Sequence, residues 1–133
     1  MWEFASGIVC AVKEYKEKAA VISVITEKNT LIKGWVNEKN LGLGSSLEVS
    51  FQKMDNQTMK FFEIQEVGYN IAQAFWNDID KLKDLLEILS LSAKIPENLF
   101  IPNLYAKLGE ALNELQIKNN SALKNWKNFL LDI

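Results

Sequence analysis

The residues best suited to chemistry in this sequence are Lys33, Gly34 and Trp35, which follow a short apolar run. In an extended strand, alternation places Lys33 and Trp35 on one face and Gly34 on the other, where the missing side chain allows close approach to the backbone. A lysine contacts phosphate, and a tryptophan ring stacks on a base for about 1–3 kcal/mol. The spacing therefore predicts a strand that contacts nucleic acid. The alternative is an ordinary barrel rim, on which lysines are solvated and Trp35 caps the core.

More lysines and a second aromatic side chain accompany this strand, in the first turn of the chain and in the segment after residue 36. The chain has 15 basic residues, all of them lysines, and a net charge of −2. Because the whole chain is not basic, a nucleic-acid site must be a local patch. The predicted DNA-binding residues are Lys13, Tyr15, Lys16, Lys18, Lys33, Trp35 and Lys39.

Catalytic and metal-binding groups are scarce. The absence of histidine removes the commonest general base and the commonest metal ligand. The single Cys10 excludes an internal disulfide and a cysteine zinc cage, and its apolar neighbours predict an inert core thiol. Three aspartates, Asp78, Asp80 and Asp84, crowd one predicted helix, where plain solvation is favoured over metal binding. We expect no enzyme activity, no cofactor and no metal.

The expected location is the cytoplasm, the default for a chain that does not depend on disulfides. No apolar run approaches the roughly 18 residues that a membrane span needs, so no membrane partner is expected.

The first half of the chain has the pattern of short strands. Residues 19–26 are rich in β-branched side chains, and apolar and polar residues alternate over 47–52. A hairpin turn is predicted at 55–57. The predicted strands cover residues 7–12, 19–26, 31–36, 47–52 and 59–67. Five short strands with tight turns predict a small closed barrel such as an OB-fold.

After Asn70 the period changes to the three- and four-residue steps of amphipathic helices. Asn70 is the predicted N-cap of a helix of about five turns that runs to Leu89. A second helix is predicted to open at Pro102, and a third follows the predicted N-cap Ser121 and runs to the chain end. The sequence thus predicts an α+β chain, with an OB-fold domain over 1–68 and a partial, three-helix domain over 69–133.

The chain has Gly-Ile-Val at 7–9, Tyr-Lys-Glu-Lys at 15–18 and an apolar stretch that ends in Thr-Glu at 21–27. In this order they resemble the N-terminus of the bacterial DNA repair family RecO. Ile-Lys-Gly at 32–34 is similar to the family's Val-Arg-Gly step, with lysine in place of arginine. Residues 99–105 look like the family's His-Pro-x-Leu-Tyr helix start, and residues 126–131 look like its next helix. The stretches that carry the resemblance are 7–9, 15–18, 21–27, 32–34, 99–105 and 126–131.

This resemblance implies an OB-fold followed by helices, and a recombination mediator that works without catalysis or nucleotide. Such a protein binds single- and double-stranded DNA, anneals complementary strands, and helps to load RecA together with RecR and single-stranded-DNA-binding protein. The family's basic run after the Val-Arg-Gly step is replaced here by residues 35–40, which predicts weak, salt-sensitive binding. Members generally continue into further helices, often around a four-cysteine zinc site, so a truncated or reduced member is expected.

A second function stays open at this point. An OB-fold protein that has lost useful DNA affinity would act as a protein-interaction adaptor. The net charge of −2 and the depleted segment 35–40 favour the adaptor, whereas the order of the motifs favours the DNA repair mediator.

Overall fold

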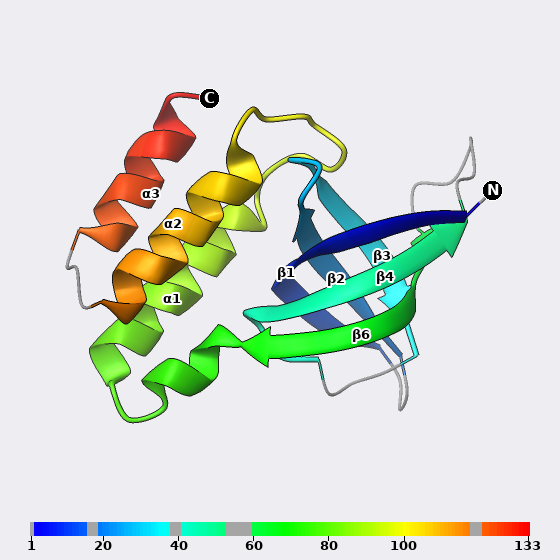
Figure 1. Ribbon diagram of the computed structural model, residues 1–133, viewed down its shortest axis with the longest axis horizontal. Coiled ribbons are helices and arrows are strands. Elements are labelled where there is room, and N and C mark those ends of the chain that lie inside the picture. The colour runs from blue at the N-terminus through cyan, green and yellow to red at the C-terminus, as the bar shows by residue number, and fades with distance from the viewer. Residues whose placement is uncertain (1, 16–18, 38–40, 53–59, 118–120) are drawn as a thin grey trace.

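The computed structural model describes residues 2–15, 19–37, 41–52, 60–117 and 121–133, and it has the predicted α+β architecture. A curled sheet and a layer of helices lie side by side (Figure 1). The strands are β1 (Trp2–Tyr15), β2 (Ala19–Thr26), β3 (Leu31–Val36), β4 (Ser45–Gln52), β5 (Lys60–Phe61) and β6 (Glu63–Asn70). The helices are the 3-10 helix η1 (Ile71–Phe75), α1 (Ile79–Ser92), α2 (Leu104–Gln116) and α3 (Ala122–Leu131). Within the described ranges, no helix has both the length and the apolar character needed to cross a bilayer.

The sheet is mixed, with the strand order β5-β3-β2-β1-β4-β6. Neighbouring strands are antiparallel except for β3 and β5, which run parallel. β5 and β6 lie at opposite edges of the sheet, yet only Phe62 separates them in sequence. The sheet therefore curls into a half-barrel whose edges approach each other at Phe62, where the Phe62 N–H donates to the carbonyl oxygen of Trp35 at 2.9 Å.

The strand prediction is confirmed in part. β2 and β3 have the predicted bounds. β1 is longer than predicted because its first half pairs with β4 and its second half with β2. The single strand predicted over 59–67 is wrong, since β5 pairs with β3 and β6 pairs with β4 on either side of Phe62. The turn predicted at 55–57 lies outside the described residues.

The concave side of the sheet is filled by apolar side chains from alternate positions, among them the fully buried Ile22 and Val24. Phe62 belongs to this core, and its ring lies over Gly34. A Cβ atom at Gly34 would lie 2.7 Å from that ring. Gly34 thus makes room for Phe62 inside the sheet and not for a ligand outside it, which corrects the expectation from the sequence.

Replacement of Gly34 tests this packing. Gly34→Ala is expected to lower the free energy of unfolding by about 1–3 kcal/mol, because the added methyl group overpacks a filled core. Gly109, inside α2, is the matched control, since a Cβ there has no neighbouring atom within 4 Å. Gly109→Ala is expected to raise the free energy of unfolding by about 0.5–1 kcal/mol. Urea unfolding followed by circular dichroism measures both, and equal effects would contradict the role given to Phe62.

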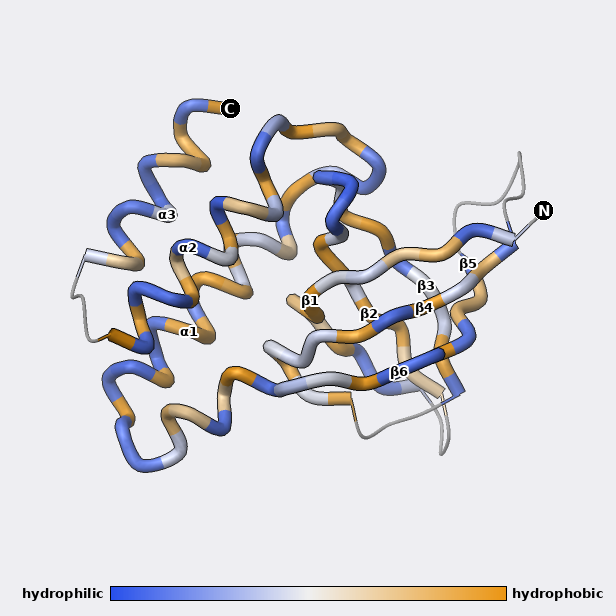
Figure 2. Tube along the Cα trace, in the orientation of Figure 1, coloured by the Kyte–Doolittle hydropathy of each residue, from blue (hydrophilic) through white to orange (hydrophobic). Residues whose placement is uncertain are grey.

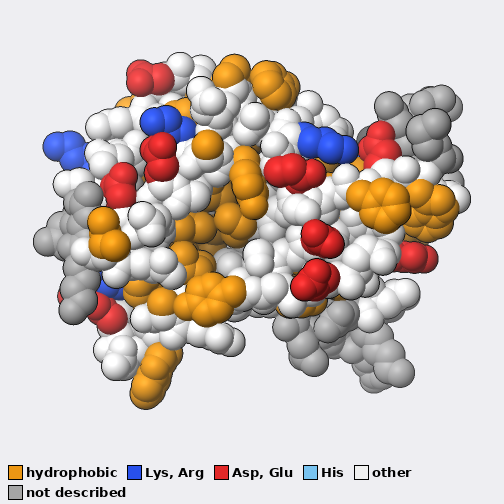
Figure 3. Space-filling model, viewed as in Figure 1, with side chains coloured by type: hydrophobic (Ala, Val, Ile, Leu, Met, Phe, Trp, Pro, Cys, Tyr) orange, Lys and Arg blue, Asp and Glu red, His pale blue; other side chains and the backbone are white. Residues whose placement is uncertain are grey.

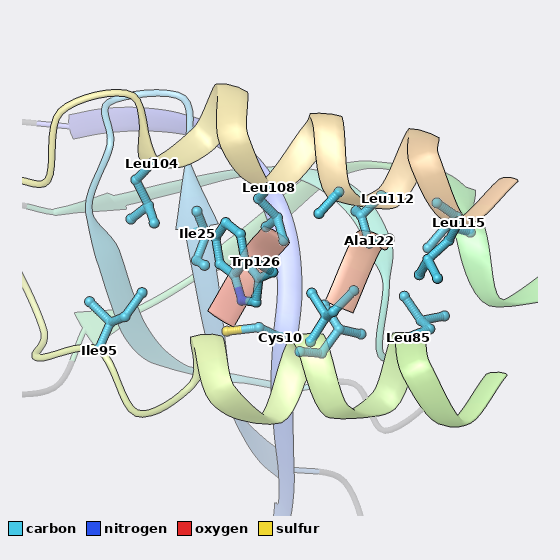
Figure 4. Packing of buried hydrophobic residues seen from close by; sticks show 14 of the residues in the cluster. Cys10, Ile25, Leu85, Ile95, Leu104, Leu108, Leu112, Leu115, Ala122 and Trp126 are labelled. Carbon is cyan, nitrogen blue, oxygen red and sulfur yellow. The ribbon is translucent and has the colours of Figure 1, made fainter. Parts of the chain in front are cut away.

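The helices α1 and α2 pack on the outer side of the sheet, the side away from the concave core, and α3 packs on these two helices (Figure 1). Hydrophobic and hydrophilic residues alternate along each helix (Figure 2), and the hydrophobic ones meet Ile25 and Cys10 of the sheet (Figure 4). Trp126 of α3 is 1% exposed and belongs to this second core, where α3 packs on α1 and α2. A bulge between Val9 and Ala11 shifts the β1 register by one residue, so that Cys10 and Ala11 both face outward.

Two helix predictions need correction. The long helix predicted from Asn70 to Leu89 is two helices, because Asp78 competes as an N-cap. Asn70 Oδ1 accepts from the Ala72 N–H at 2.8 Å and caps η1, while Asp78 Oδ1 accepts from the Lys81 N–H at 3.2 Å and caps α1. The second helix begins at Leu104 and not at Pro102. The third begins directly after Ser121, as predicted.

Candidate nucleic-acid interface

A row of side chains crosses the outer face of the sheet where the helices do not cover it. Lys13, Val21, Trp35 and Phe61 are direct register partners across β1, β2, β3 and β5. Partners in neighbouring strands point to the same side of a sheet. The predicted residues Lys13 and Trp35 therefore lie in one row. We use the name aromatic row for Lys13, Tyr15, Trp35 and Phe61.

Two aromatic rings of this row, those of Tyr15 and Trp35, lie close to each other, and all three rings of the row are at least partly accessible. The Tyr15 and Trp35 ring centroids are 5.0 Å apart at an interplanar angle of 57°. The Lys13 Nζ lies 5.2 Å from the Tyr15 ring centroid, within the range of a cation–π contact. Trp35 is half-buried, Tyr15 is 38% exposed and Phe61 is 70% exposed. The row can therefore stack on planar groups. Trp35 and Tyr15 hold each other in place, whereas Phe61 is largely exposed.

Phe61 is absent from the predicted set. The available signal was the pair Phe61-Phe62 inside a predicted strand, since consecutive strand residues face opposite sides and one of the two rings must point outward. Which ring was outside depended on register, which the sequence alone did not provide.

Lys33 lies one step nearer to the helices, opposite Ser23 of β2. Burial raises the pKa of the Cys10 thiol to about 12, although a backbone hydrogen bond and the positive charge of Lys33 act to lower it. The thiol, 2% exposed, is thus neutral at physiological pH, in agreement with the predicted inert core cysteine. Among the described residues, no carboxylate lies within ion-pair distance of Lys13 or Lys33.

One acid borders the row. The segment after α1 runs beside β3, where Leu31 and Glu97 form an isolated parallel bridge. Glu97 Oε2 accepts from the Lys33 backbone N–H at 3.2 Å and lies 3.9 Å from the Lys60 Nζ. This carboxylate neutralises one cation at the edge of the sheet, and it limits the positive field of the site.

No family model matches the chain, and no curated protein matches it either.

The structure brings together four of the predicted residues, namely Lys13, Tyr15, Lys33 and Trp35. The other three, Lys16, Lys18 and Lys39, lie outside the described residues. Chemically, the described part of the site offers aromatic faces and two cations without carboxylate partners in the described ranges. The only thiol of the chain, Cys10, is buried and protonated.

Proposed function

We propose that this chain is a non-catalytic nucleic-acid-binding protein related to the RecO family, and that it binds single-stranded DNA along the aromatic row. The observation that carries the proposal is the alignment of Lys13, Trp35 and Phe61 on one uncovered face, with Tyr15 against Trp35. Aromatic faces beside a cationic track are the usual means of binding single strands without sequence preference.

The finer fold that we propose is an OB-fold. If β5 and β6 are counted as one strand interrupted at Phe62, the sheet has five strands. That last strand pairs with β4 through β6 and with β3 through β5, so it joins the two edges of the sheet. OB-folds bind oligonucleotides on the face of strands 2 and 3. Trp35 and Val21 belong to that face, which supports the assignment.

The resemblance to RecO supplies the biological role in this proposal. The chain anneals single strands and helps to load recombinase with RecR and single-stranded-DNA-binding protein. Duplex DNA hides its base faces, so it engages only the lysines and binds more weakly.

Titration of a fluorescent single-stranded oligonucleotide with the intact chain, followed by fluorescence anisotropy, tests the proposal. Saturable binding that weakens with salt supports it. Absence of binding at low salt would overturn it and would leave the adaptor function in its place.

A separate prediction concerns the contribution of the lysines to the salt dependence of oligonucleotide binding. Replacement of both Lys13 and Lys33 by alanine is expected to flatten the slope of log K against log salt by about 1.4, because each phosphate contact to a single strand contributes about 0.7. The matched control replaces Lys83 of α1 and Lys124 of α3, which are exposed and away from the row, and it leaves the slope unchanged. The same slope change in both double variants would contradict the assigned site.

A further inference from the structure

The outer face of β1, β4 and β6 has the opposite charge to the aromatic row. Acidic side chains gather there in Figure 3, with hydrophobic ones at the end near the N-terminus. Glu27, Glu48 and Glu66 are all exposed on this face. Lys28, which follows Glu27 in the chain, donates from its Nζ to the carbonyl oxygen of Phe4 at 3.3 Å. Nucleic acid is repelled from such a face, so its ligand must be of another kind.

Two hollows lie next to each other on this face. The first, of about 140 Å³, has Phe4, Glu27 and Glu48 in its walls. The second, of about 230 Å³, has Tyr105, Glu48 and Glu66 in its walls. Each hollow therefore combines one aromatic side chain with two carboxylates, and Glu48 is common to both. We call the two hollows together the acidic groove.

The size of the hollows indicates what they hold. Both are smaller than the roughly 300–1,000 Å³ of small-molecule sites. Each has room for one long side chain. A carboxylate pair and an aromatic ring together recognise a cation, through ion pairs and a cation–π contact.

The groove contains an unfavourable pair of like charges in the described structure. Glu48 and Glu66 are direct partners on β4 and β6, an arrangement that destabilises a sheet. Within the described ranges, no lysine lies within ion-pair distance of either carboxylate. The Ser6 hydroxyl donates to Glu48 Oε1 at 3.4 Å. A cation bound between the two carboxylates would remove the repulsion.

We propose that the acidic groove binds an extended segment of a partner protein that carries two basic side chains two residues apart. The hollows follow each other along β4, with Val49 in the first and Leu47 in the second. Two residues of a strand span about 7 Å, which is also the spacing of alternate side chains in an extended peptide. The partner thus presents both cations from one side of its backbone, and it leaves the aromatic row free.

The test uses a fluorescein-labelled peptide, Gly-Ser-Thr-Arg-Thr-Arg-Thr-Ser-Gly, titrated with the full chain at low salt. Saturable binding is expected. Glu48→Gln is expected to weaken it about fivefold or more, because both arginines lose the carboxylate that they share. Glu110→Gln on α2 is the matched control, since Glu110 is exposed and outside the groove, and it leaves the affinity unchanged. Absence of saturable binding, or equal weakening by the two substitutions, would overturn the proposal.

Two further arms separate docking from general attraction between charges. Ser46→Leu fills the second hollow without altering any charge, and it is expected to weaken binding as Glu48→Gln does. A peptide of the same composition with adjacent arginines is expected to bind less tightly. Full affinity in either arm would overturn the proposal. Oligonucleotide binding by Glu48→Gln stays at the level of the unaltered chain, so failure of this inference is distinguishable from failure of the proposed function.

Discussion

Phe61→Ala is expected to weaken binding of a single-stranded oligonucleotide about fivefold to hundredfold, because stacking of one base contributes about 1–3 kcal/mol. The slope of affinity against salt stays the same, since a phenyl ring releases no counterions. Phe61 is 70% exposed, so loss of its ring leaves the core intact and changes stability little. Fluorescence anisotropy of a labelled single strand measures the affinity, and urea unfolding confirms the fold.

Phe4→Ala provides the matched control for this experiment. Phe4 is an exposed aromatic residue of the same sheet, 63% exposed, but it belongs to the acidic groove. Its loss is expected to leave oligonucleotide affinity unchanged. Equal weakening by the two substitutions would show that any exposed ring suffices, and no weakening by Phe61→Ala would remove the aromatic row from the binding site.

Trp126→Ala has the largest expected effect on stability, a loss of about 3–5 kcal/mol. Trp126 is 1% exposed where α3 packs on α1 and α2, so its removal leaves a cavity among the three helices (Figure 4). A domain is stable by about 5–15 kcal/mol in total, and such a loss brings the chain close to unfolding. Urea unfolding followed by far-ultraviolet circular dichroism measures the change.

The indole nitrogen adds a second expectation. Trp126 Nε1 is buried and has no hydrogen-bond partner in the described structure, which costs the folded state about 1–3 kcal/mol. Trp126→Phe removes this unsatisfied donor along with some volume, so it is expected to cost less than half as much as Trp126→Ala. Trp76→Ala is the control, because Trp76 is 79% exposed and its loss changes stability by about 0.5 kcal/mol or less. A large loss in the control would contradict this account.

What the sequence predicts correctly depends on local signals. The end of β2 follows from a β-branched run that stops at the polar turn around residues 27–30, and β3 starts directly after that turn. The start of α3 directly after Ser121 follows from the onset of an apolar period. In each case the chain near the element contains the information that places it.

What the sequence does not predict depends on contacts between distant residues. The division between β5 and β6 arises because Phe62 turns into the core over Gly34, and Gly34 lies on another strand. Glu97 reaches the Lys33 backbone across 64 positions of sequence. The acidic groove requires the register of β1, β4 and β6 together. None of these contacts can be predicted from the hydrophobic periodicity of the sequence.

The bulge at Cys10 has a consequence for how β1 tolerates change. Before it, the odd-numbered residues Ala5 and Val9 face the concave core; after it, the even-numbered Val12 does, and the odd-numbered Lys13 faces outward. A complete mutational scan of β1 would therefore show two alternating patterns of opposite phase that meet at Cys10. Outward-facing positions in the first half of β1 can therefore change to suit a ligand of the acidic groove, and those in the second half can change to suit a ligand of the aromatic row. Neither change alters the residues that face the concave core.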